Sequence, residues 1–147
     1  MAEHNERDVL NRLIQTCRDG ERGFRYAANH VRSPEVKALF LEIAGQRDAF
    51  AGEVLPHAQR LGGAAAPDGS NVGALHRGWM TIKDAIGTHD DAVIIREAER
   101  GERMALAAYE DALDGVLHPT TRDVIERQCA HVRQSHNRVH ALLLAVA

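Results

Sequence analysis

This sequence is poor in aromatic residues, in cysteine and in long apolar runs. Phenylalanine, tyrosine and tryptophan make up 4% of the 147 residues, whereas alanine, leucine, glutamate and arginine are abundant, which is a helical composition. No apolar run approaches the ~20 residues of a membrane span, and the polar start MAEHNERD lacks a signal-peptide pattern. We therefore expect a cytoplasmic protein with no membrane partner. Cys17 and Cys129 form no Cys-x-x-Cys pair, and we interpret them as reduced, buried thiols.

An excess of positive charge is also missing, since the formal net charge is −3 and the pI is near 6.3. Proteins that bind nucleic acid need a basic surface, so we expect no nucleic-acid partner. The sequence contains no phosphate-binding glycine loop and no Gly-x-Ser-x-Gly motif for nucleophilic catalysis. Its length suits a single domain, which we assign to residues 1–147. The motifs decide neither for nor against an enzymatic activity.

Four long helical patterns run through the chain. Their apolar residues recur at three- and four-residue steps, and the patterns extend over residues 5–29, 34–61, 91–114 and 119–146. Ser33 before Pro34 is a strong helix start, and Gly115 is a typical helix stop. A shorter helix is expected within the long connection between the second and third patterns, from about Ser70 to Ile86.

The lengths of the connections predict how these helices assemble. The first and second helices, and likewise the third and fourth, are joined by short connections, whereas a long crossover joins the second to the third. This pattern is typical of an all-α, ferritin-like four-helix bundle, here with a crossover that carries a short extra helix. The first and fourth helices are then parallel, and the second and third run in the opposite direction.

Polar residues interrupt the apolar stripes of all four helices. The interruptions are Glu21 in the first helix, Gln46 and Arg47 in the second, Glu99 and Glu102 in the third, and His136 in the fourth. Counting about 1.5 Å per residue from the helix ends places these residues on one level of the bundle, to within about a helical turn. A buried carboxylate costs several kcal/mol unless it is protonated, paired, hydrogen-bonded or bound to a metal, so the layer needs an explanation.

Two interpretations of this layer stay open, and both require that these residues lie on the inward faces of their helices. Glutamate and histidine bind iron or manganese in bundle cores, so the layer predicts a metal site formed by Glu21, Glu99, Glu102 and His136. Oxidation of Fe(II) by dioxygen or peroxide is its natural chemistry, with Tyr109 as a neighbouring redox or hydrogen-bonding group or simply a core residue. In the alternative the layer is metal-free, and the glutamates are neutralised by Arg25, Arg47 or Arg100. The protein is then a structural or interaction protein.

The fourth helix offers a further candidate for binding a transition metal at the surface. His136 and His140 share a face one turn apart, and His131 lies on the same helix. Nine histidines in 147 residues make such spacing frequent by chance. Either interpretation of the protein is compatible with a homo-oligomer.

Several runs of the sequence resemble a bacterial family of unknown function. These runs are DGERGF (19–24), KALFLEIAGQRDAFAGEV (37–54), GALHRGW (73–79), ERGE (99–102) and SHNRV (135–139). The family is classed as ferritin-like, so the resemblance implies that fold across nearly the whole chain. The wider superfamily implies a dimetal carboxylate site with oxidase, peroxidase or iron-handling chemistry, built from two glutamates and two Glu-x-x-His motifs. This sequence has no Glu-x-x-His, which leaves a reduced mononuclear site or the metal-free network.

Overall fold

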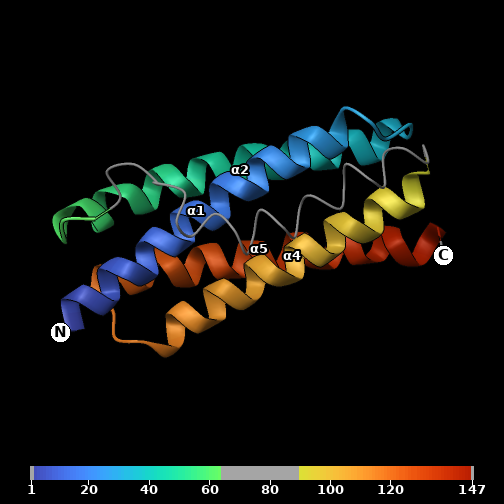
Figure 1. The fold of residues 1–147 in the computed structure, drawn as a ribbon. Coiled ribbons are helices and arrows are strands. Elements are labelled where there is room, and N and C mark those ends of the chain that lie inside the picture. The colour runs from blue at the N-terminus through green and yellow to red at the C-terminus, as the bar shows by residue number, and fades with distance from the viewer. Residues whose placement is uncertain (1, 64–89, 147) are drawn as a thin grey trace.

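The structure, a computed structural model, describes residues 2–63 and 90–146 (Figure 1). In these ranges the chain forms four long helices and no strand. The helices are α1 (Ala2–Ala28), α2 (Pro34–Arg60), α4 (Asp91–Asp114) and α5 (Pro119–Val146). The prediction of an all-α four-helix bundle is confirmed. The predicted crossover and its short extra helix fall at residues 64–89, outside the described residues.

The helix ends follow from local sequence signals. Ser33 caps α2, because its hydroxyl accepts a hydrogen bond from the backbone N–H of Val36 at 3.3 Å. Asp90 caps α4 in the same way, with its carboxylate 2.9 Å from the N–H of Ala92. The first helix begins at Ala2 and not at Asn5 as predicted.

Consecutive helices form two antiparallel hairpins in the described part of the chain, α1–α2 and α4–α5 (Figure 1). The hairpins pack together through contacts of α1 with α4 and of α2 with α5. As Figure 1 shows, α1 and α5 run in one direction and α2 and α4 in the other. These are the directions that the sequence predicted. The end of α2 and the start of α4 therefore lie at opposite ends of the bundle.

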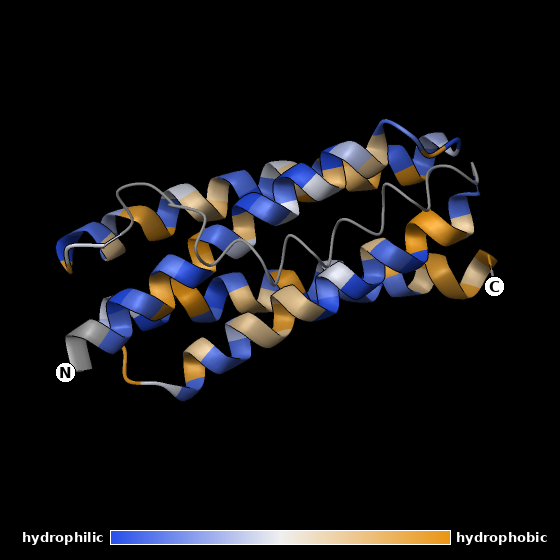
Figure 2. Ribbon diagram, viewed as in Figure 1, coloured by the Kyte–Doolittle hydropathy of each residue, from blue (hydrophilic) through white to orange (hydrophobic). Residues whose placement is uncertain are grey.

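The apolar faces of the helices meet in two buried clusters, and the hydropathy colouring alternates along each helix accordingly (Figure 2). The first cluster includes Phe24, Phe40, Ile43, Ile94 and Val139. The second cluster includes Leu13, Val54, Tyr109, Ile125 and Val132. On every helix a short gap separates the residues of the two clusters, and buried polar residues fill this gap. None of the helices in the described ranges is apolar over a length that could cross a membrane.

One carboxylate connects the two hairpins at the turn between α1 and α2. Asp91, the first residue of α4, accepts the backbone N–H of Arg32 at 2.8 Å and that of Ser33 at 2.9 Å. Backbone donors at a helix start have no partner within the helix, so an acceptor from elsewhere stabilises the turn. Asp91 therefore holds the first turn of the second hairpin against the loop of the first.

Candidate functional site

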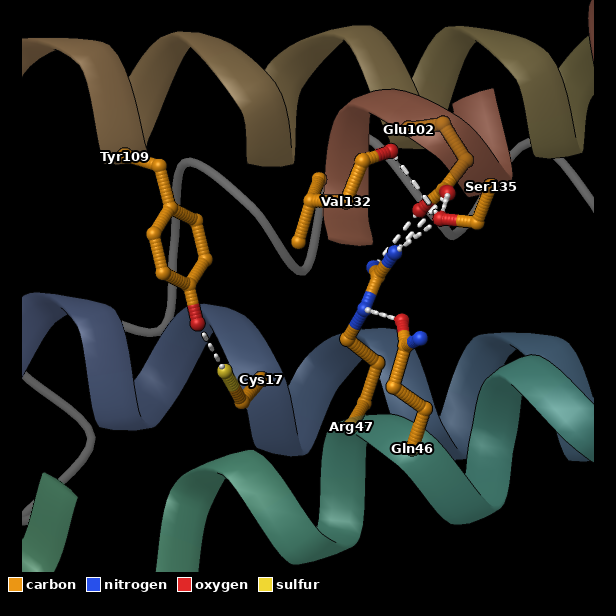
Figure 3. A network of polar contacts seen from close by, with 7 residues as sticks. All are labelled: Cys17, Gln46, Arg47, Glu102, Tyr109, Val132 and Ser135. Atoms are coloured by element: carbon orange, nitrogen blue, oxygen red, sulfur yellow. Dashed lines mark hydrogen bonds and ion pairs between the residues drawn. The ribbon is translucent and has the colours of Figure 1, made fainter. Parts of the chain in front are cut away.

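The polar layer between the two clusters is centred on the ion pair of Arg47 and Glu102 (Figure 3). The side chains are 1% and 0% exposed. Arg47 binds the carboxylate with two hydrogen bonds, Nη1 to Oε1 at 2.6 Å and Nη2 to Oε2 at 2.8 Å. Ser135 completes the group, because its hydroxyl lies 2.8 Å from Arg47 Nη2 and 2.7 Å from Glu102 Oε2. The ion pair, whose two charges cancel, therefore joins α2 to α4, and the hydroxyl of Ser135 joins both to α5.

The first helix makes room for this guanidinium. Gly20 of α1 is buried against Arg47, and a Cβ at that position would lie 3.5 Å from Arg47 Cγ. The ring of Phe24, one turn further along α1, lies 6.0 Å from Arg47 Cζ, within the range of a cation–π contact. Burial opposes the charge of Arg47, but the neighbouring Glu102 outweighs it and raises the pKa of Arg47 above its usual value.

Glu21 does not belong to this layer, which corrects the prediction that it faces the core. Its side chain is 24% exposed and pairs with Arg25, one turn along α1, at 3.1 Å. Stripes through position 20 and through position 21 both fit the three- and four-residue steps of α1. The stripe through Gly20 is the buried one, because the Arg47 side chain occupies the space over that glycine.

Glu99 and His136 meet, but apart from the ion pair of Glu102. Glu99 lies 2.9 Å from His136 Nε2 and 3.1 Å from Arg103 Nε, while His140 Nδ1 stands 3.7 Å away. The glutamate side chain is 6% exposed, whereas the side chains of His136 and His140 are 18% and 49% exposed. This group therefore lies at the edge of the α4–α5 contact and opens toward solvent.

The predicted ligands do not form one metal shell. Both oxygens of Glu102 face the guanidinium of Arg47, so a divalent cation there would meet a charge of its own sign. Glu21 is turned away, and Glu99 has its own cationic partner in Arg103. Among the residues that the structure describes, no three histidine, cysteine, aspartate or glutamate side chains are grouped so that they could hold a metal ion. This donor set does not fit the dimetal carboxylate site implied by the superfamily.

A second polar chain crosses the bundle through Tyr109. Its hydroxyl lies 3.1 Å from the Cys17 sulfur (Figure 3). The same hydroxyl donates to Gln128 Oε1 at 2.7 Å. Since the phenolic proton is used by Gln128, the thiol of Cys17 is the donor to Tyr109. Gln128 Nε2 in turn donates to the backbone carbonyl of Phe50 at 3.3 Å. Tyr109 is thus a buried hydrogen-bonding residue, as one of the predicted alternatives proposed, and both cysteines are free and buried.

Cys17 and Tyr109 are buried groups that become charged when they lose a proton, so they predict a loss of stability at alkaline pH. Burial raises the pKa of Cys17 above the ordinary 9.0 and that of Tyr109 well above the ordinary 10.0. Between the unfolded and folded pKa values the native state keeps protons that the unfolded chain releases. The contribution of this pair to the free energy of unfolding is therefore constant below about pH 8 and then falls, by up to about 1.4 kcal/mol per pH unit for each group.

Urea denaturation at about pH 8 and about pH 10.5 checks this dependence. The matched control is the double variant Cys17→Ala/Tyr109→Phe, in which both of these titrating groups are gone. We expect a shallower decline in the variant than in the wild type. Equal declines would contradict the assignment of the alkaline loss to this pair.

Sequence reasoning missed two buried carboxylates of α1, Asp19 and Glu6, and the second of them links distant segments. Glu6 lies in the first turns of the helix. Its side chain is 4% exposed, and it accepts the backbone N–H of His118 at 2.8 Å and lies 2.7 Å from His118 Nδ1. The available signal was its position four residues before the buried Leu10 on the same face of α1. The pair joins the first helix to the residue that precedes α5.

One family description matches most of the chain. Residues 5–115 match the family described as a domain of unknown function (DUF2383), and the chain belongs to this family. The matched range includes all of α2 and α4 and most of α1. No curated protein matches the chain. The resemblance to a family of unknown function, stated from the sequence, is confirmed.

Proposed function

We propose that this protein is a structural or interaction module, a four-helix bundle whose central layer is held by an internal ion pair in place of a metal ion. The observation that supports this most is the two-point contact between Arg47 and Glu102, with both hydrogen bonds at 2.6–2.8 Å. The guanidinium supplies the positive charge that a buried carboxylate requires. A bidentate pair of this kind is also directional, so it favours one relative position of its two helices.

In this proposal the ion pair serves to select one packing of the hairpins. Arg47 comes from the first hairpin, whereas Glu102 and Ser135 come from the second. A shift of one helical turn between the hairpins would bury both charges without partners, and an unpaired buried charge costs about 3–5 kcal/mol. The result is a rigid scaffold that presents the outer faces of its helices to a partner. The predicted homo-oligomer stays a prediction.

The competing proposal is a protein that binds iron or manganese for oxidation of Fe(II) or handling of peroxide. Glu99 and His136 are the two predicted ligands that lie together, 2.9 Å apart. Glu102 is committed to Arg47, and Glu21 is committed to Arg25. The geometry therefore supports the metal-free module better.

Metal analysis after loading with Fe(II) or Mn(II) distinguishes the two proposals. We expect near-zero metal in the wild type and in the variants Glu102→Gln and Glu99→Gln. We also expect the melting temperature of the wild type to be the same with and without a chelator. About one ion per chain in the wild type, lost in either variant and accompanied by a chelator-sensitive melting curve, would overturn the metal-free module.

A further inference from the structure

A hollow of about 230 Å³ lies at the end of the bundle where α2 ends and α5 begins. Its polar walls are formed by Glu6, His57, Arg60, His118, Thr120 and Thr121. These residues come from three separate segments of the chain, so the hollow exists only in the folded bundle. None of them takes part in the central ion pair.

The donors of this hollow are arranged around His57. Arg60 Nη2 donates to His57 Nδ1, and the hydroxyl of Thr121 lies 2.8 Å from the same nitrogen. A guanidinium is always a donor, so Nδ1 is an acceptor and the neutral ring carries its hydrogen on Nε2. Arg60 has five N–H donors, and among the described residues its one recorded partner is this imidazole. No other hydrogen bond of this guanidinium occurs among residues 2–63 and 90–146, so we treat its remaining N–H groups as the donors to a ligand.

The one carboxylate in the wall does not neutralise Arg60. Both oxygens of Glu6 are used by His118, one by its backbone N–H and the other by Nδ1. No salt bridge of Arg60 occurs within the part of the chain that the structure describes. Burial and, after it, the charge of Arg60 lower the pKa of His57, while the negative charge of Glu6 acts in the opposite direction.

We propose that this hollow binds a small tetrahedral oxyanion of the phosphate class. The fork of an arginine matches two oxygens of such an ion, and the hydroxyl of Thr120 and the Nε2–H of His57 are suitable donors for the others, whereas the hydroxyl of Thr121 already donates to His57 Nδ1. The volume corresponds to about seven or eight waters at ~30 Å³ each. It is smaller than the ~300–1,000 Å³ of sites for larger organic ligands. An ion of phosphate size fits, whereas a nucleotide does not.

An NMR titration with inorganic phosphate at constant ionic strength tests the proposal. In the wild type we expect saturable shifts of the amide signals of Thr120 and Thr121. In Arg60→Gln the affinity is expected to fall about tenfold or more, because a charge-assisted hydrogen bond is lost. The matched control is Arg133→Gln. Arg133 pairs with the exposed Glu110 at 3.3 Å. It lies twelve residues beyond Thr121 on α5, a distance of about 18 Å along the helix.

Several outcomes decide the question. Unchanged affinity in Arg133→Gln together with weakened affinity in Arg60→Gln and in a second variant, His57→Gln, supports the site. Shifts that do not saturate, that chloride reproduces, or that are equal in Arg60→Gln and the wild type overturn it. Melting curves of each variant show whether the fold is intact. The result does not depend on the metal analysis, since the hollow and the ion pair share no residue.

Discussion

Replacing Glu102 with alanine is expected to destabilise the protein by about 3–5 kcal/mol, because the change leaves the charge of Arg47 buried without a counterion. This loss is a large part of the ~5–15 kcal/mol that stabilises a typical domain. For a domain of this size each kcal/mol lowers the melting temperature by about 2–4 °C, so a fall of roughly 6–20 °C is expected. Thermal and urea denaturation followed by circular dichroism measure both quantities.

Two controls separate the buried pair from ordinary surface pairs. Glu110→Ala removes an ion pair with Arg133 whose side chains are 54% and 51% exposed, and its expected cost is below about 1 kcal/mol. The double variant Arg47→Met/Glu102→Leu removes both buried charges and is expected to be far less destabilised than Glu102→Ala. If Glu102→Ala costs no more than Glu110→Ala, the ion pair does not organise the core as described.

The second large effect is expected for Phe24→Ala, at about 3–5 kcal/mol. Phe24 is fully buried, contacts the ring of Phe40 edge-on at a centroid distance of 5.3 Å, and lies under the guanidinium of Arg47. Its removal leaves a cavity between the first apolar cluster and the polar layer. The neighbouring atoms of a close-packed bundle can fill such a cavity only in part.

Denaturation of two matched variants checks the effect of Phe24→Ala. Tyr26→Ala removes an aromatic ring from the same helix, but this ring is 36% exposed, so a much smaller loss is expected. Phe24→Leu keeps most of the volume and should cost less than the alanine variant. Similar losses in Phe24→Ala and Tyr26→Ala would show that burial at position 24 is not what stabilises this end of the bundle.

The number, type and direction of the four long helices could be predicted from the sequence because the signals for them are local. Helical periodicity marked the four long segments, and Ser33 with Pro34 marked the start of α2 to the residue. The stop at Gly115 was also correct. These features depend on neighbours within a few positions, which a sequence displays directly.

The candidate site was predicted in part, because its composition depends on contacts between helices. The sequence placed Glu99, Glu102 and Arg47 at one level, and the structure buries all three. It named Arg47 as one of three arginines that could neutralise the glutamates, but it did not reveal that Arg47 pairs with Glu102, nor that Glu21 turns outward. The spacing of apolar residues along one helix locates its buried face only to within one position. In α1 the buried position is Gly20 and not Glu21, because Gly20 leaves room for the side chain of Arg47.

The pairing of residues in distant segments left no signal in the sequence, even where the burial of one partner, Glu6, left one. Glu6 and His118 are separated by 112 positions, and Asp91 and Ser33 by 58. Neither pair belongs to a repeating pattern, and each depends on how the hairpins are finally packed. Only the folded arrangement shows that these acids accept backbone hydrogens.

The first hairpin, α1–α2, depends on a hydrogen-bond acceptor that it does not contain, the carboxylate of Asp91 in α4. The N–H groups of Arg32 and Ser33 find their acceptor on the other half of the molecule. A fragment that ends after α2 would leave these donors to water and would expose the apolar faces of both its helices. We therefore expect the first hairpin to fold poorly on its own and the bundle to unfold in an all-or-none manner.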